Sequence, residues 1–235
     1  MLKKIIYTFI LIAITLTEVY ANGVQISGTR LIYDGSKNNA SINISNNDDQ
    51  VYLIQSWVTQ NPYSKKASDD IFITTPPLFR LEANTNNSVR VVQTGKKLPS
   101  DRESVFWLNI KSIPSTNKPD GQNMLLIAVK TQIKLFYRPA NLPGKSAEAY
   151  KKIQFINKSG RLAINNPTPY SVSFKSIKIN GKDIANPPMV LPFETQYVNK
   201  NVSVNDNVSW QSINDFGGIT LEEHATVRSN NNAAN

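Results

Sequence analysis

The sequence predicts an all-β protein made of two β-sandwich domains, and three observations support this fold class. Short apolar alternations recur between clusters of Asn, Asp, Ser, Gly and Pro, as in strands joined by turns. No segment carries an apolar stripe of helical spacing over more than two turns. The chain of 235 residues is long enough for two cores, and segment 138–144 contains two prolines and a glycine, as a linker would.

The first segment, 1–21, has the pattern of a cleaved secretory signal. Lys3 and Lys4 precede the apolar run 5–16, and the small Ala21, with Val19 two positions before it, resembles a signal peptidase site. The run is shorter than the ~20 residues that a membrane-spanning helix needs. We therefore expect an exported protein with no membrane insertion.

The first sandwich is expected over residues 22–140. Its apolar alternations predict seven or so short strands, at a spacing typical of a sandwich. The alternations lie at 24–26, 42–44, 51–58, 71–73, 89–91 and 105–110, followed by a long one from Leu125.

The second sandwich is expected over residues 141–228, before a polar tail at 229–235. Asn180 and Gly181 form a clear turn signal because Asn-Gly accepts the positive φ of a hairpin turn. The segment 166–170, Asn-Pro-Thr-Pro-Tyr, is another because proline fixes φ. Strands are expected at 153–156, 161–165, 172–179, 189–191, 195–198, 208–213 and 219–221.

The composition argues against an enzyme, a metalloprotein and a nucleic-acid-binding protein. The chain has no cysteine and one histidine, His224, which we expect on a solvated surface or edge strand. Its glycines form no phosphate-binding loop, so no cofactor is expected. Removing Lys3, Lys4 and Glu18 with the signal leaves 24 basic and 16 acidic residues, a net charge of +8, but no dense basic run with interleaved aromatic residues.

The most informative segment is 125–138, LLIAVKTQIKLFYR. Its even positions from 130 to 134 carry Lys, Gln and Lys. A strand of up to fourteen residues is much longer than the usual five or six. It is either a central core strand or a strand that lends part of its apolar row to a partner's sheet, and its length favours the second interpretation. The apolar odd positions are Leu125, Ile127, Val129, Ile133 and Leu135.

Seven short motifs follow one another along both expected domains. They are GTRLIY at 28–33, TPPLFRLE at 75–82, DRES at 101–104, NIKSIP at 109–114, IKLFYRP at 133–139, NPTPY at 166–170 and INDFGG at 213–218. Together and in this order, they resemble the periplasmic pilus chaperones of the PapD-like family. The resemblance covers essentially the whole mature chain.

The resemblance implies two immunoglobulin-like domains joined at an angle, with a cleft that holds the C-terminus of a pilus subunit, or pilin. Arg30 and Lys134 would anchor the terminal carboxylate through charge-assisted hydrogen bonds. Leu125, Ile127 and Val129 would be the donor row that fills the groove of an incomplete pilin. Lys134 is at an even position and this row is at odd positions, so regular alternation would place them on opposite faces of the strand. The sequence leaves open whether a bulge changes this or whether the anchor and the groove lie on different sides of the strand.

The resemblance also implies an interdomain ion network of Glu103, Arg138 and Asp215. A bidentate arginine between two carboxylates would set the angle of the cleft more than it would add stability. The segment 114–123 is short and lacks cysteine, which resembles the short-loop subclass that serves rod-like pili.

The expected function is that of a non-enzymatic periplasmic chaperone that binds pilus subunits and delivers them to an outer-membrane usher. The alternative is an exported immunoglobulin-like adhesin or pilus subunit. A subunit would carry an extension of alternating apolar residues before its first strand, whereas after removal of the expected signal only Asn22 and Gly23 precede Val24. A sugar-active enzyme would need two carboxylates across a cleft. The sequence leaves open whether the free chain caps its donor row by forming a dimer.

Overall fold

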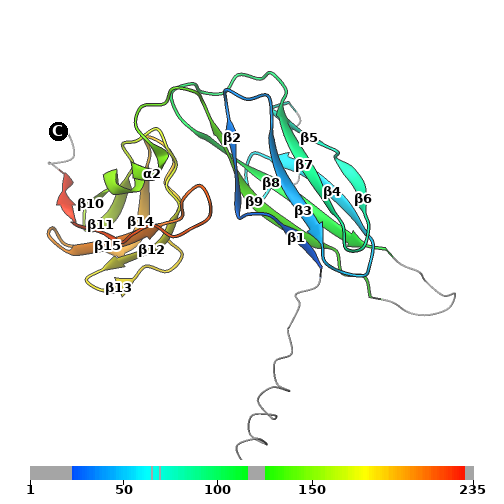
Figure 1. Ribbon diagram of the computed structural model, residues 1–235. Coiled ribbons are helices and arrows are strands. Elements are labelled where there is room, and N and C mark those ends of the chain that lie inside the picture. Colours follow the sequence, from blue (N-terminus) through cyan, green and yellow to red (C-terminus); the bar gives the residue numbers. More distant parts are fainter. Residues whose placement is uncertain (1–22, 65, 69, 116–124, 231–235) are drawn as a thin grey trace, which may run out of the picture.

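The computed structural model describes residues 23–64, 66–68, 70–115 and 125–230. The expected signal segment 1–21 and most of the 114–123 loop lie outside these residues. Two β-sandwiches lie at an angle to each other and are joined by the segment between strand β9 and the short helix α2 (Figure 1). Within the described residues, no helix is long and apolar enough to cross a membrane.

The first sandwich consists of two sheets whose alternating strands bury their apolar faces against each other. Its core contains Tyr33, Phe72 and Leu135, all fully or almost fully buried. One sheet has the order β1 (Val24–Ile26), β3 (Ala40–Asn46), β7 (Asn86–Gln93), β5 (Phe72–Thr75). The other, which includes one parallel pair, has the order β2 (Arg30–Asp34), β9 (Val129–Arg138), β8 (Ser104–Pro114), β4 (Tyr52–Thr59), β6 (Leu78–Leu81).

The second sandwich encloses a separate core in which Trp210 packs on Phe155, with 4.8 Å between ring centroids. The indole N–H of Trp210 donates to the carbonyl of Tyr150 at 3.0 Å, which satisfies the polar group of a buried aromatic residue. Helix α2 (Ser146–Ala149) and the 3-10 turn η1 (Tyr150–Lys152) lead into the first of its strands. The sheets are β14 (Thr195–Asn201), β11 (Arg161–Asn165), β10 (Gln154–Lys158), β17 (Arg228–Ser229), and β13 (Lys182–Asp183), β12 (Phe174–Ile179), β15 (Asn207–Ser212), β16 (Glu223–Thr226).

The predicted all-β class and the two-sandwich architecture are confirmed, and so is the hairpin turn at Asn180 and Gly181, whose φ angles are +50° and +76°. His224 is exposed in β16, a strand at the edge of its sheet. Some expectations were wrong in detail. The strands expected at 189–191 and 219–221 are only isolated bridges, of Val190 with Val172 and of Ile219 with Ile213. The long strand begins at Val129, and residues 125–128 have no regular structure. The predicted tail begins too early, because Ser229 pairs with Asn157 in β17.

Candidate functional site

The two predicted anchor residues lie directly opposite each other on neighbouring strands. Gly28, with φ +121°, stands where the chain passes from β1 in one sheet to β2 in the other. Strand β2 then pairs in parallel with β9, and the pairing begins with Arg30 opposite Lys134. Paired residues of neighbouring strands point to the same face of a sheet. The fold therefore brings together two cations that lie 104 positions apart in the sequence.

Both cations reach across to the second sandwich. Arg30 Nη1 donates to the carbonyl of Ile213 at 2.9 Å, and its guanidinium lies 5.7 Å from the centre of the Phe136 ring. Lys134 Nζ donates to Ser173 Oγ at 3.1 Å. An open cavity of about 330 Å³ lies beside both residues and is also lined by Trp107, Gln132 and Gly217, among others. The cleft between the domains thus has a cationic wall.

Partial burial makes this pair of charges costly in the free chain. Burial lowers the pKa of Lys134, and the nearby charge of Arg30 lowers it further. Burial also lowers the pKa of Arg30, an effect that Asp215 partly opposes. No carboxylate of the described residues forms an ion pair with either cation. An incoming carboxylate would supply the missing charge, so the site is suited to bind an anion.

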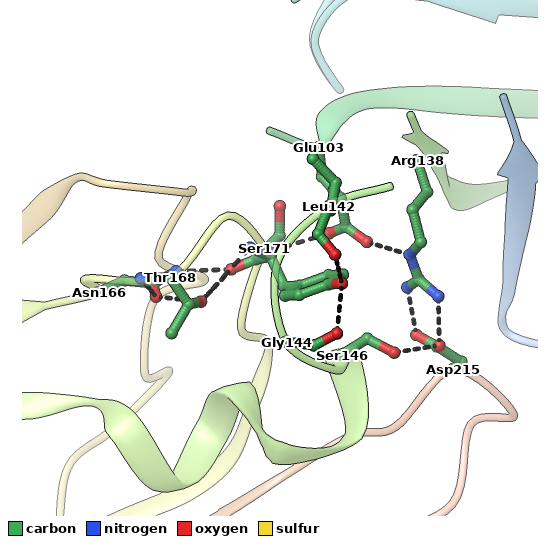
Figure 2. Close-up of polar contacts among 10 residues, drawn as sticks. Glu103, Arg138, Leu142, Gly144, Ser146, Asn166, Thr168, Ser171 and Asp215 are labelled. Atoms are coloured by element: carbon green, nitrogen blue, oxygen red, sulfur yellow. Dashed lines mark hydrogen bonds and ion pairs between the residues drawn. The ribbon is translucent and has the colours of Figure 1, made fainter. Parts of the chain in front are cut away.

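The three residues of the expected ion network meet at the domain junction. Arg138 Nε donates to Glu103 Oε1 at 2.7 Å, and its Nη1 and Nη2 donate to the two carboxylate oxygens of Asp215 at 2.8 and 2.9 Å (Figure 2). Glu103 also accepts a hydrogen bond from the backbone N–H of Ser171 at 2.8 Å, and Ser146 Oγ donates to Asp215 at 2.9 Å. Arg138 on β9 and Glu103, directly before β8, are thereby tied to two loops of the second sandwich.

The two carboxylates of this network respond differently to burial. The side chain of Glu103 is 2% exposed, and burial raises its pKa despite the adjacent Arg138. Burial alone would also raise the pKa of Asp215, but the hydrogen bonds and charge of Arg138 outweigh it, and the pKa is lowered. Glu103 consequently depends on Arg138 to remain charged inside the junction.

The sequence did not indicate the partners that the second sandwich supplies. The carbonyl of Ile213, the hydroxyls of Ser146 and Ser173 and the backbone N–H of Ser171 have no local sequence signal as site residues. The motif 166–170 lies near them: Asn166 is buried, and its side-chain amide donates to three carbonyls, one of them that of Tyr170 at 2.7 Å. This turn holds the loop from which Ser171 reaches Glu103.

Of the expected donor row, Val129 lies at an open strand edge, and Leu125 and Ile127 lie in the irregular segment that precedes it. Leu125, Ile127 and Val129 are 83%, 66% and 55% exposed. Because the pairing with β2 begins at Lys134, residues 129–133 of β9 have β8 on one side and no other described strand on the other. An exposed edge with apolar side chains normally invites pairing with another chain.

The parity question is answered within strand β9. The register between β8 and β9 runs without a shift from Ser112–Val129 to Ser104–Tyr137, so no bulge lies there. Val129 therefore has the same orientation as the buried Ile133, whereas Lys134 lies on the opposite face. Lys134 and Val129, the one residue of the predicted donor row that lies within β9, are therefore on different faces of the strand.

Comparison with known proteins places both sandwiches in one family. The model for the "Pili and flagellar-assembly chaperone, PapD N-terminal domain" matches residues 23–143, and that for the "Pili assembly chaperone PapD, C-terminal domain" matches residues 148–224. A relative, the "Chaperone protein LpfB" of Salmonella typhimurium strain LT2, is 39% identical over 222 residues, which cover 89% of this chain and 91% of the relative.

Solved structures give the same result. A chain in the Salmonella enterica complex of the SafA pilin with the SafB chaperone matches with a TM-score of 0.78 and 31% identity, covering 89% of this chain and 99% of that one. The periplasmic chaperone SfaE matches with a TM-score of 0.72 and 33% identity, covering 88% and 98%. These findings favour the chaperone over the alternative of an adhesin or pilus subunit. The chain belongs to the PapD-like family of pili assembly chaperones, which are not enzymes.

Proposed function

We propose that this chain is a periplasmic chaperone that captures pilus subunits by donor-strand complementation and delivers them to an outer-membrane usher. The observation that carries the proposal is the position of two unpaired cations, Arg30 and Lys134, at one end of an open apolar strand edge. The similarity to the SafA–SafB complex and to the periplasmic SfaE supports it. The short segment 114–123 further suggests rod-like pili.

In this proposal, Arg30 and Lys134 bind the C-terminal carboxylate of the subunit. Each charge-assisted hydrogen bond contributes about 1.5–3 kcal/mol where it replaces no equally good partner. On binding a carboxylate, Lys134 loses only its hydrogen bond to the hydroxyl of Ser173. The anchor fixes where the subunit's last strand ends, and thus its register along β9.

The open edge of β9 then completes the subunit. Its backbone at 129–133 adds a strand to the subunit's sheet, while Leu125, Ile127 and Val129 enter the apolar groove left by the missing strand. Burying three such side chains stabilises the complex by at most roughly 5–9 kcal/mol, at ~1.5–3 kcal/mol each. In the free chain this edge is exposed. Gel filtration of the free chain tests whether two copies cover it by forming a dimer.

Transfer to the usher would be driven by differential binding. The sequence has no nucleotide-binding loop, so the subunit must leave because a competing strand binds its groove more tightly. The competitor would be the extension of another subunit.

We expect Ile127→Asp to weaken subunit binding at least tenfold, because it places an unpaired charge in an apolar groove. The matched control is Ile73→Asp, since Ile73 is also an exposed isoleucine but lies on β5, in the opposite sheet. Titration of a purified subunit against both variants checks this. Equal affinity for Ile127→Asp and the parent would eliminate the donor role.

We expect subunit affinity to fall as the pH rises through the lowered pKa of Lys134. In the free chain the charged lysine is disfavoured by burial, whereas a bound carboxylate favours it and raises its pKa. Affinity should therefore decrease as the pH rises through the lowered pKa that Lys134 has in the free chain. Lys134→Arg should remove this decrease because a guanidinium remains charged. The same decrease in parent and variant would show that another group titrates.

A further inference from the structure

The motif DRES at 101–104 supplies a second side chain to the domain junction besides that of Glu103. Arg102 belongs to the first sandwich, and its guanidinium lies 5.0 Å from the centre of the Phe193 ring, which belongs to the second. Asp101 orients this guanidinium by accepting hydrogen bonds from its Nε at 3.1 Å and its Nη2 at 2.8 Å. The proposed capture of a subunit makes no use of the contact between Arg102 and Phe193.

Phe193 has a backbone conformation that phenylalanine rarely adopts. Its φ angle is +59°, in the left-handed region, where a bulky side chain is strained. The backbone N–H of Phe193 donates to the carbonyl of Thr168 at 3.2 Å, and this bond helps to hold the conformation. The residue is 46% exposed, so its ring does not serve to fill the core of the second sandwich. A strained residue whose side chain lies outside the core indicates a role for that side chain elsewhere.

Arg102 and Glu103 contact the second sandwich at separate points. The side chain of Glu103 belongs to the ion network, and its backbone N–H donates to the carbonyl of Pro169 at 2.9 Å. Arg102 instead contacts Phe193, which precedes strand β14. Two domains of one chain move relative to each other unless their interface prevents it. A single point of contact allows them to pivot about that point, and a second, separate contact restricts the rotation.

The charges around Arg102 are consistent with this second contact. Hydrogen bonding to Asp101 raises the pKa of Arg102, and the charge of Glu194, the residue after Phe193, raises it too. The guanidinium therefore lies within the electrostatic influence of both sandwiches. A cation above an aromatic face is attracted by the negative potential of the ring.

We propose that Arg102 and Phe193 are positioning residues that, together with the ion network, fix the angle between the two sandwiches. The strained conformation of Phe193 presents its ring to Arg102. The anchor cations lie on the first sandwich, and their partners Ser173 and Ile213 lie on the second, so this angle sets the width of the cleft. The effect on subunit binding rests on the proposed function, whereas the effect on the angle does not.

The angle can be tested in the free chain by double electron–electron resonance. The chain has no cysteine, so Ser41→Cys and Lys175→Cys, at one exposed site in each sandwich, can carry two spin labels. We expect a narrow distribution of distances between the labels. Phe193→Asn, which accepts the same φ without a ring, and Arg102→Ala should each widen it. Phe193→Tyr should restore the parent's width because it keeps an aromatic face.

Two further variants make the test specific. The double variant of Arg102→Ala and Phe193→Asn should be no wider than either single variant, because both remove the same contact. The matched control is Tyr197→Asn, since Tyr197 is an exposed aromatic residue whose ring contacts Lys158 of its own sandwich. It should keep the parent's distribution. Single variants with the parent's width, or a double variant that adds their two effects, would overturn the proposal.

Subunit affinity separates this proposal from the proposed function. Phe193→Asn should weaken the binding of a purified subunit about two- to fivefold, as expected for one exposed cation–π contact. A loss with Lys134→Ala but none with Phe193→Asn would show that the anchor acts and that the angle does not limit binding. A wider distribution in Phe193→Asn, with no subunit binding even to the parent, would support the positioning role and refute the proposed function.

Discussion

Replacing Arg138 with alanine should destabilise the protein by about 3–5 kcal/mol at neutral pH, the range observed when one member of a buried ion pair is removed. Arg138 is the partner of two carboxylates, and Glu103 would be left charged and 2% exposed in the domain junction. Urea unfolding followed by tryptophan fluorescence measures the loss. This loss of stability should be larger than the loss on removing one partner of any ion pair at the surface.

The destabilisation should depend on pH in a defined direction. Burial already raises the pKa of Glu103, and without Arg138 the pKa rises further. A carboxyl group with a raised folded-state pKa favours the folded state below its unfolded-state pKa and loses that contribution as the pH rises through the folded-state pKa. Arg138→Ala should therefore lose less stability at about pH 5 than at about pH 8.

The control for this experiment is Arg80→Ala. Arg80 pairs with Glu82 on the exposed surface of the first sandwich, and its removal should change stability little. Adding Glu103→Gln to Arg138→Ala should recover part of the loss and flatten its pH dependence, since the orphaned charge is gone. If Arg138→Ala is no less stable than Arg80→Ala, the network does not hold the junction.

Replacing Lys134 with alanine should weaken subunit binding by about 10- to 150-fold, which corresponds to one charge-assisted hydrogen bond of ~1.5–3 kcal/mol. The fold should remain intact, because Lys134 makes one hydrogen bond, to Ser173, and its charge is disfavoured by burial. A titration with a purified subunit measures the affinity, and circular dichroism checks the fold.

The matched control is Lys130→Ala. Lys130 lies on the same face of β9 and carries the same charge, but its ammonium lies over the Trp57 ring at 5.5 Å rather than in the cleft. The Lys130→Ala variant should bind the subunit nearly as well as the parent does. Equal losses for both lysines would indicate general electrostatic attraction instead of a specific anchor.

Local patterns in the sequence were sufficient to predict the fold class. Alternation of apolar residues predicts which side of β9 is buried, as Ile133 and Leu135 show. Asn-Gly at 180–181 predicts its turn because few residue pairs accept two consecutive positive φ angles. The motif order then implied the correct family.

The site was only partly predictable because its geometry comes from long-range contacts. The parallel pairing that places Arg30 opposite Lys134 has no counterpart in the local sequence pattern. The same holds for Ser173 and for the carbonyl of Ile213, which the second sandwich brings to the cations. The strand that starts at Val129 is shorter than the pattern predicted, since alternation at 125–128 does not provide a neighbouring strand to pair with.

The central claim is that one lysine in the cleft decides whether subunits are retained. The most direct test is a periplasmic pull-down of the tagged mature chain beside its Lys134→Ala and Lys130→Ala variants, with mass spectrometry of the proteins that co-purify. We expect small pilin-like proteins with the parent and Lys130→Ala and none with Lys134→Ala. Pilins retained equally by Lys134→Ala, or absent from the parent while pili are being made, would contradict the account.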